Sequence, residues 1–194
     1  MKIGIDIDDT LTNIKEELDN AWDEYAKKLG KKTNKNEYDW KNDNNGKSMQ
    51  KKYNLSYEEL KYFLATTHEE ITSKALPRNN VKEIIDKLKK DGHEIYIITA
   101  RDSEFHKDPY KLSKDWLEKN YIYYDKLIVN AREKAIVCQE EKIDLFIDDQ
   151  LNNCMEVSKV GIKTIRISSD ENRYENIVTL TNWNEIYNYI KGME

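Results

Sequence analysis

The chain has 194 residues and a formal net charge of −5 at pH 7, with 36% charged and 38% hydrophobic residues. This length suits one domain with a buried core and leaves room for a small second lobe. The negative charge gives no overall reason to expect nucleic-acid binding, and no apolar stretch approaches membrane-spanning length.

The first predicted strand, Lys2 to Asp8, carries isoleucine at every second position, so Ile3, Ile5 and Ile7 share one face. A helix from about Asn13 to Leu29 follows it. Further helices are predicted at about 57–74, 81–91, 109–119, 133–140, near 152 and at 184–191. Further strands are predicted at 93–99, 126–130, 143–148 and 163–167. The alternation predicts an α/β fold, a Rossmann-like parallel sheet of about five strands with helices on both faces.

The gap between the first two predicted strands is unusually long. It spans about 85 residues, although a strand–helix–strand unit needs only roughly 30. The surplus is polar and helical, and Ser56 with Glu59 forms the capping-box pattern of a helix start. Insertions at the carboxyl ends of parallel strands lie over the ligand crevice. We therefore expect a core of residues 1–14 and 77–194, and a helical cap of residues 15–76 inserted after the first strand.

The two cysteines, Cys138 and Cys154, lie in helix-like contexts without the spacing of a metal site. We expect both to be reduced and buried. Because the sequence also lacks a signal-peptide pattern, we expect a cytoplasmic protein.

The strongest chemical signal is the acidic pair Asp6 and Asp8, which follows the first strand. Clustered carboxylates near a buried strand must be compensated, and a divalent cation with oxygen ligands would do so. A helix N-terminus capped by Asp9, Thr10 or Thr12 would explain one acid but not the pair.

Three further elements fall at or near strand ends, where ligands bind in open α/β sheets. They are Thr99-Ala100-Arg101 after the second strand, Lys134 ahead of the fourth, and Asp148-Asp149 at the end of the fourth. We expect all of them to face one crevice with the first acidic pair.

These residues resemble the four motifs of the haloacid dehalogenase-like phosphohydrolase superfamily, in the same order and at similar spacing. The motifs match as Asp6-Ile7-Asp8-Asp9-Thr10, Thr99, Lys134 and Asp148-Asp149, and the insertion resembles a type-one cap. The phrases Leu76-Pro77, Ile98-Thr99-Ala100-Arg101 and Phe146-Ile147-Asp148-Asp149 look most like the 5′(3′)-deoxyribonucleotidase branch and its bacterial relatives.

The resemblance implies that Asp6 is a nucleophile that forms an aspartyl-phosphate, and that Asp8 is the general acid and then the general base. It also implies Mg²⁺, held by Asp6, the Asp8 carbonyl and Asp148. Asp149 is expected to reach the metal through water or to orient Lys134.

The implied phosphate-binding residues are Asp9, Thr10, Thr99, Ala100 and Lys134. Many members of the superfamily have glycine where this chain has Asp9. Because glycine tolerates a positive φ and aspartate tolerates it better than most residues, Asp9 is expected to be compatible with the loop.

Substrate contacts are expected from Arg101 and from two aromatic residues of a polar cap segment, Tyr38 and Trp40. Other cap aromatics, Trp22, Tyr25, Tyr62 and Phe63, are expected to form the cap's own core instead. Of the histidines, His68 and His93 are expected on the cap surface and at a strand edge, and His106 in the loop after the second strand.

The resemblance implies a magnesium-dependent phosphomonoesterase for small phosphorylated metabolites, with nucleoside 5′-monophosphates the leading candidates. A sugar-phosphate phosphatase or a phosphomutase of the same superfamily is the alternative within this class. A catalytically inactive relative that binds a ligand or partner is the alternative from a different class. No membrane or nucleic-acid partner is expected, and the oligomeric state is left open.

Overall fold

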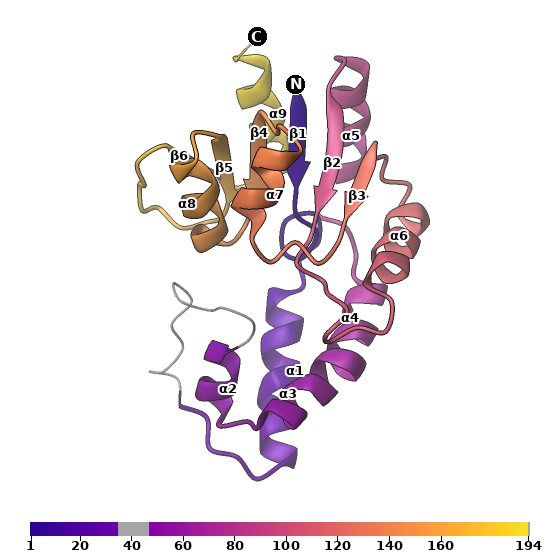
Figure 1. The fold of residues 1–194 in the computed structure, drawn as a ribbon, viewed down its shortest axis with the longest axis vertical. Coiled ribbons are helices and arrows are strands. Elements are labelled where there is room, and N and C mark those ends of the chain that lie inside the picture. The colour runs from indigo at the N-terminus through magenta and orange to yellow at the C-terminus, as the bar shows by residue number, and fades with distance from the viewer. Residues whose placement is uncertain (35–46, 194) are drawn as a thin grey trace.

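The computed structural model describes residues 1–34 and 47–193, and within them six parallel strands form one sheet (Figure 1). The strands are β1 (Lys2–Ile5), β2 (Glu94–Ile98), β3 (Lys126–Ile128), β4 (Leu145–Asp148), β5 (Lys163–Ile167) and β6 (Ile177–Leu180), in the order β3-β2-β1-β4-β5-β6. Central β1 pairs Ile5 with Ile97 of β2 and with Ile147 of β4. The carboxyl ends of these three strands therefore lie side by side.

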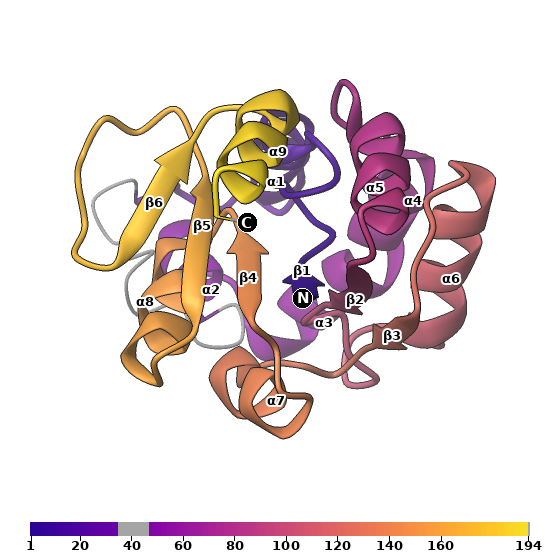
Figure 2. The same ribbon diagram turned by 90° about the horizontal axis from the view of Figure 1, so that it is seen from above.

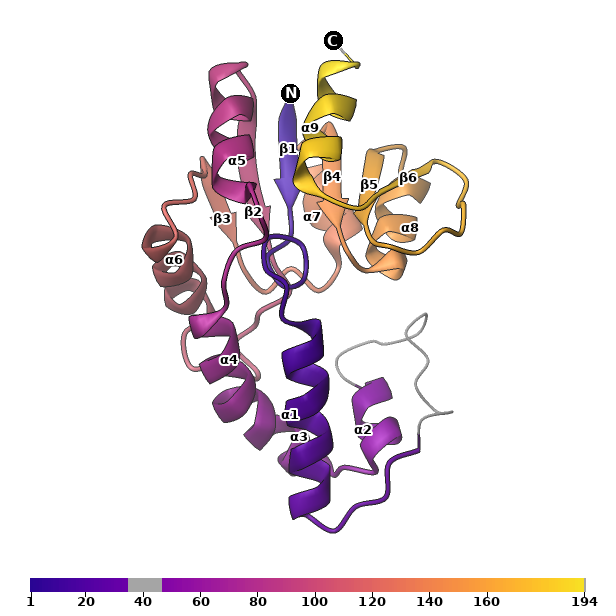
Figure 3. The ribbon, with the colours of Figure 1, turned by 180° about the vertical axis from the view of Figure 1, so that it is seen from behind.

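Helices cover both faces of the sheet, as the alternation of strands and helices predicted (Figures 2 and 3). One face packs against α5 (Val81–Lys90), α6 (Pro109–Lys119) and α9 (Trp183–Lys191), and the other against α7 (Lys134–Glu140) and α8 (Leu151–Lys159). Apolar residues at helical spacing explain the packing of α5, because Val81, Ile84, Ile85 and Leu88 form one buried stripe.

The segment between β1 and α5 folds into helices beyond the carboxyl ends of the strands (Figure 1). It contains α1 (Lys15–Lys28), α2 (Lys47–Tyr53), α3 (Tyr57–Phe63), a π-helical turn (Leu64–His68) and α4 (Glu69–Lys74). Ser56 and Glu59 form the expected capping box at the start of α3. Inside this segment the Trp22 ring stacks on Phe63 at a centroid distance of 3.4 Å. Phe105, from the loop between β2 and α6, packs into the same cluster.

Several expectations need correction. The strand predicted to reach Asp8 ends at Ile5, and neither α2 nor β6 was predicted. Tyr62, expected in the core of the inserted segment, is 62% exposed, and His93, expected at a strand edge, is buried. Both cysteines are free and buried, as expected.

The two aromatic residues predicted to contact substrate, Tyr38 and Trp40, lie outside the described residues. Among the described residues, no helix is long and apolar enough to cross a membrane.

Candidate active site

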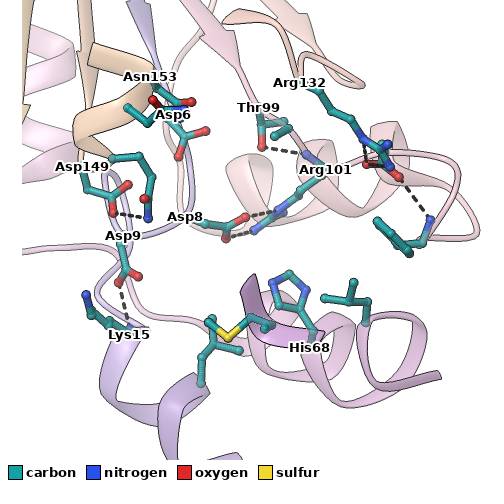
Figure 4. A pocket seen from close by; sticks show the side chains of 18 of the residues that line it. Asp6, Asp8, Asp9, Lys15, His68, Thr99, Arg101, Arg132, Asp149 and Asn153 are labelled. Carbon is teal, nitrogen blue, oxygen red and sulfur yellow. Dashed lines mark hydrogen bonds and ion pairs between the residues drawn. The ribbon is translucent and has the colours of Figure 1, made fainter. Parts of the chain in front are cut away.

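A cavity of about 380 Å³ lies between the carboxyl ends of the strands and the inserted segment (Figure 4). The sequence-predicted residues that line it are Asp6, Asp8, Asp9, Thr99, Ala100, Arg101, Lys134 and Asp149. Because β1, β2 and β4 are adjacent and parallel, residues far apart in sequence reach this one place. The crevice therefore brings most of the motif residues together, while Asp148 and Thr10 lie outside its lining.

The centre of the site is an acidic cluster built around one lysine. The Nζ of Lys134 lies 2.5 Å from Oδ1 of Asp6 and 2.7 Å from Oδ2 of Asp148. Carboxylate oxygens of Asp6, Asp148 and Asp149 all lie within 4.8 Å of one another. Two of these carboxylates pair with the single Lys134 ammonium group and the third lies close by, which leaves little positive charge for three acids in a largely buried place.

The electrostatics of the cluster follow from this imbalance. Burial raises the pKa of Asp6 above its ordinary value, and Lys134 only partly opposes the shift. Burial also raises the pKa of Asp149, and the neighbouring Asp148 and Asp6 raise it further. Burial by itself would lower the pKa of Lys134, but the effect of the nearby Asp148 and Asp6 carboxylates is larger and opposite. The pKa of Lys134 is therefore raised, and the side chain keeps its ammonium form. The chemistry of this donor set fits a divalent cation, which prefers carboxylate oxygens and would compensate the remaining charge.

The two acids at the end of β4, both expected near the metal, have different surroundings in the structure. The Asp148 carboxylate accepts hydrogen bonds from Lys134 Nζ, Asn153 Nδ2 (3.0 Å) and the Gln150 backbone N–H (2.7 Å), and it is fully buried. It therefore orients Lys134, the role considered for Asp149. The Asp149 side chain lines the cavity instead, so it is the better placed of the two to meet a ligand.

The second acid of the first motif forms a bidentate ion pair. Arg101 Nη2 and Nε lie 2.7 and 2.9 Å from the two carboxylate oxygens of Asp8 (Figure 4). Burial alone would raise the pKa of Asp8, but the Arg101 guanidinium outweighs it and holds the pKa at about 2. Asp8 is therefore ionised in this arrangement, and it must leave Arg101 before it can carry a proton near neutral pH.

Two residues expected to bind phosphate have other partners. The Asp9 backbone N–H donates to Thr12 Oγ1, and its Oδ1 accepts from the N–H groups of Ile14 and Lys15 at the start of α1. Thr10 is buried behind the cavity, where its hydroxyl accepts the Asp149 N–H at 3.0 Å. These contacts shape the loop, with Asp9 at the cavity and Thr10 outside its lining.

Asp9 has a positive φ of 55°, a conformation that glycine adopts freely and that aspartate was expected to tolerate here. Asp9→Ala should lower the free energy of unfolding by about 2 kcal/mol. Alanine removes two hydrogen bonds, and it is less stable than aspartate in the left-handed conformation that this position requires. Asp9→Asn, which tolerates this conformation and keeps the acceptor oxygen, should change stability by less than about 0.5 kcal/mol. Urea unfolding of both variants measures the difference, and equal stability would contradict the capping role.

Thr99 and Ala100 follow the end of β2 and line the cavity, where they were expected. The Thr99 hydroxyl accepts a long hydrogen bond from the Arg101 N–H at 3.4 Å, so its own hydrogen remains available as a donor. Its backbone N–H and C=O are engaged with Ile128 and Ala131, which fixes the loop.

Sequence reasoning missed or misplaced several lining residues. His68, expected on the cap surface, lines the cavity from the π-helical turn, and Arg132 and Asn153 line it from the core (Figure 4). Asn153 could have been inferred, because it lies in the first turn of the helix that follows the acidic pair. Nothing in the sequence distinguishes Arg132 from the many other basic residues.

Comparison with known proteins agrees with this geometry. The family model described as haloacid dehalogenase-like hydrolase matches residues 3–114. The nucleotidase CA_C3379 of Clostridium acetobutylicum is 33% identical over 142 residues, which cover 71% of this chain and 68% of that protein.

Two solved structures share the fold. The haloacid dehalogenase-like hydrolase SP0104 from Streptococcus pneumoniae has a TM-score of 0.70 at 15% identity, with 97% of each chain covered. The hydrolase YfnB from Bacillus subtilis, described as bound to magnesium, has a TM-score of 0.61 at 13% identity, again with 97% of each chain covered.

Proposed function

Because the chain belongs to the haloacid dehalogenase-like hydrolase family, we propose that it is a magnesium-dependent phosphomonoesterase that acts on nucleoside 5′-monophosphates. The observation that carries the proposal is the acidic cluster of Asp6, Asp148 and Asp149 around Lys134 at the floor of the cavity. The similarity to a nucleotidase supports the choice of substrate.

The metal would be held by the carboxylates of Asp6 and Asp149 and by the main-chain carbonyl of Asp8. Bound there, Mg²⁺ would neutralise charge so that an anionic phosphate can approach an anionic carboxylate. Lys134 contributes to the same end, since it is buried and Asp148 holds it beside Asp6.

In the proposed reaction, an Asp6 carboxylate oxygen forms a bond to phosphorus as the bond between phosphorus and the leaving oxygen breaks. Asp8 gives its proton to the leaving oxygen and later takes one from the water that hydrolyses the aspartyl-phosphate. Thr99 donates its hydroxyl hydrogen to a phosphoryl oxygen. Because Asp8 is ionised while it is paired with Arg101, this sequence requires the pair to open when substrate binds.

We propose that the inserted segment acts as the cap that selects the substrate. The side of the cavity that it forms is largely apolar, with Leu18, Trp22, Met49, Leu60 and Leu64 among the lining residues. An apolar wall opposite a charged floor suits a substrate with a phosphate at one end and a nucleoside at the other.

Phosphate release from a panel of nucleoside monophosphates, sugar phosphates and p-nitrophenyl phosphate tests the proposal. We expect release with Mg²⁺ and a loss of at least about 100-fold in EDTA, because the acidic cluster then keeps its uncompensated charge. The highest kcat/KM should belong to a nucleotide. Preference for a sugar phosphate would replace the substrate assignment, and no release from any ester would favour a ligand-binding role.

A further inference from the structure

A pair of histidines joins the inserted segment to the core at the edge of the cavity. His68 lies at the end of the π-helical turn, and His106 lies in the loop between β2 and α6. Nδ1 of His68 is 3.3 Å from Nε2 of His106. π-helical turns often mark functional positions, and both imidazoles line the cavity.

The contacts of this pair fix which nitrogen of His68 is an acceptor. Nδ1 of His106 lies 3.3 Å from the backbone carbonyl of Asp102, which can only accept, so this nitrogen carries the hydrogen. Nε2 of a neutral His106 is then an acceptor, and His68 Nδ1 donates to it. It follows that Nε2 of a neutral His68 carries a lone pair.

Both histidines are neutral near pH 7. Burial lowers the pKa of His68 to about 4, more than the nearby Asp8 carboxylate raises it. Burial likewise lowers the pKa of His106.

The imidazole of His68 lies beside the charged pair formed by Asp8 and Arg101 (Figure 4). Asp8 is the acid that the proposed reaction uses on the leaving oxygen, so a group beside Asp8 would meet the alcohol portion of a bound substrate. Arg101 adds a donor here, because its Nη1 is buried and has no hydrogen-bond partner among the described residues. A buried donor without a partner costs free energy, and a ligand oxygen would satisfy it.

We propose that His68 is a specificity-determining residue whose Nε2 accepts a hydrogen bond from a hydroxyl on the alcohol portion of the substrate. Arg101 Nη1, which is buried while Arg101 is paired with Asp8, would donate to an oxygen in the same region once that pair opens. A hydroxyl both donates and accepts, so it matches this acceptor and donor in one cavity. The proposal rests on the proposed phosphomonoesterase function and adds to it that the enzyme selects esters of hydroxylated alcohols, such as the 3′-hydroxyl of a deoxynucleotide.

The test compares two substrates that differ by one hydroxyl, a 2′-deoxynucleoside 5′-monophosphate and its 2′,3′-dideoxy analogue. The wild-type protein should favour the first by about tenfold in kcat/KM, because a site built for a hydroxyl is left with unpaired polar groups by the analogue. His68→Asn keeps an amide near the Nδ1 position but has nothing at the Nε2 position. His68→Gln, one methylene longer, places its amide near the Nε2 position.

We expect His68→Asn to lose the tenfold preference and His68→Gln to keep most of it. p-Nitrophenyl phosphate, which has no such hydroxyl, separates this effect from general damage to the site. An unchanged preference in His68→Asn, or equal loss in both variants, would overturn the proposal. If the wild-type protein releases phosphate from none of the three esters, the proposed function fails instead.

Discussion

Asp6→Asn should lower kcat by at least about 10⁴-fold, because an amide cannot replace the carboxylate that attacks phosphorus. The fold should survive. Burial raises the pKa of Asp6 to about 7, so the fold already accommodates the neutral side chain near neutral pH, and asparagine mimics that form. Lys134 keeps its ion pair with Asp148 in the variant. Phosphate release and thermal unfolding measure the two effects.

Asp86→Asn is the matched control, because it makes the same chemical change on the exposed side of α5, where Asp86 pairs with Lys82. We expect wild-type activity and a stability change below about 0.5 kcal/mol from it. Turnover by Asp6→Asn within tenfold of the wild-type rate would rule out Asp6 as the nucleophile.

Lys134→Met should lower the free energy of unfolding by about 3–5 kcal/mol in EDTA, because it leaves buried carboxylates without their cation. The Lys134 side chain is 2% exposed and bridges Asp6 and Asp148, so water cannot replace it. Mg²⁺ should recover part of this loss, since it would compensate Asp6, which Lys134 also pairs with, and kcat/KM should fall by at least about 100-fold. Urea unfolding with Mg²⁺ and with EDTA measures the stability change.

The control for this variant is Lys82→Met, which removes an exposed lysine from its ion pair with Asp86. Its expected effect is below about 0.5 kcal/mol, with no dependence on Mg²⁺. If Lys134→Met were as stable in EDTA as Lys82→Met, the acidic cluster would not need its lysine and the electrostatic account of the site would be wrong.

The sequence predicted the parts of the fold that depend on local pattern. The alternating isoleucines of β1 and the capping box of Ser56 and Glu59 act over a few residues, and both are present in the structure. The parallel sheet then brings the end of β1 next to the ends of β2 and β4, which is why the motif residues meet in one cavity.

The sequence did not predict elements whose local pattern is weak. The only described apolar positions of α2 are Met49 and Tyr53 in a helix with three lysines, so its stability depends on packing against α1 and α3. The edge strand β6 has one buried and three half-buried residues, a pattern without the alternation of a half-buried strand.

Side-chain roles in the site depended on contacts that sequence does not contain. Adjacent acids at the end of β4 look equivalent, but Lys134 and Asn153 bind Asp148 and leave Asp149 facing the cavity. The pairing of Asp8 with Arg101, 93 residues away, required the three-dimensional arrangement in the same way.

Asp6 is expected to carry the phosphoryl group during turnover. Acid-quenching the wild-type protein during hydrolysis of a nucleoside monophosphate with Mg²⁺, followed by borohydride reduction, would convert an aspartyl-phosphate into homoserine. Mass spectrometry of the N-terminal peptide should then find homoserine at position 6, dependent on substrate and absent from Asp6→Asn. Homoserine at another position, or rapid phosphate release with unmodified Asp6 throughout, would contradict the account.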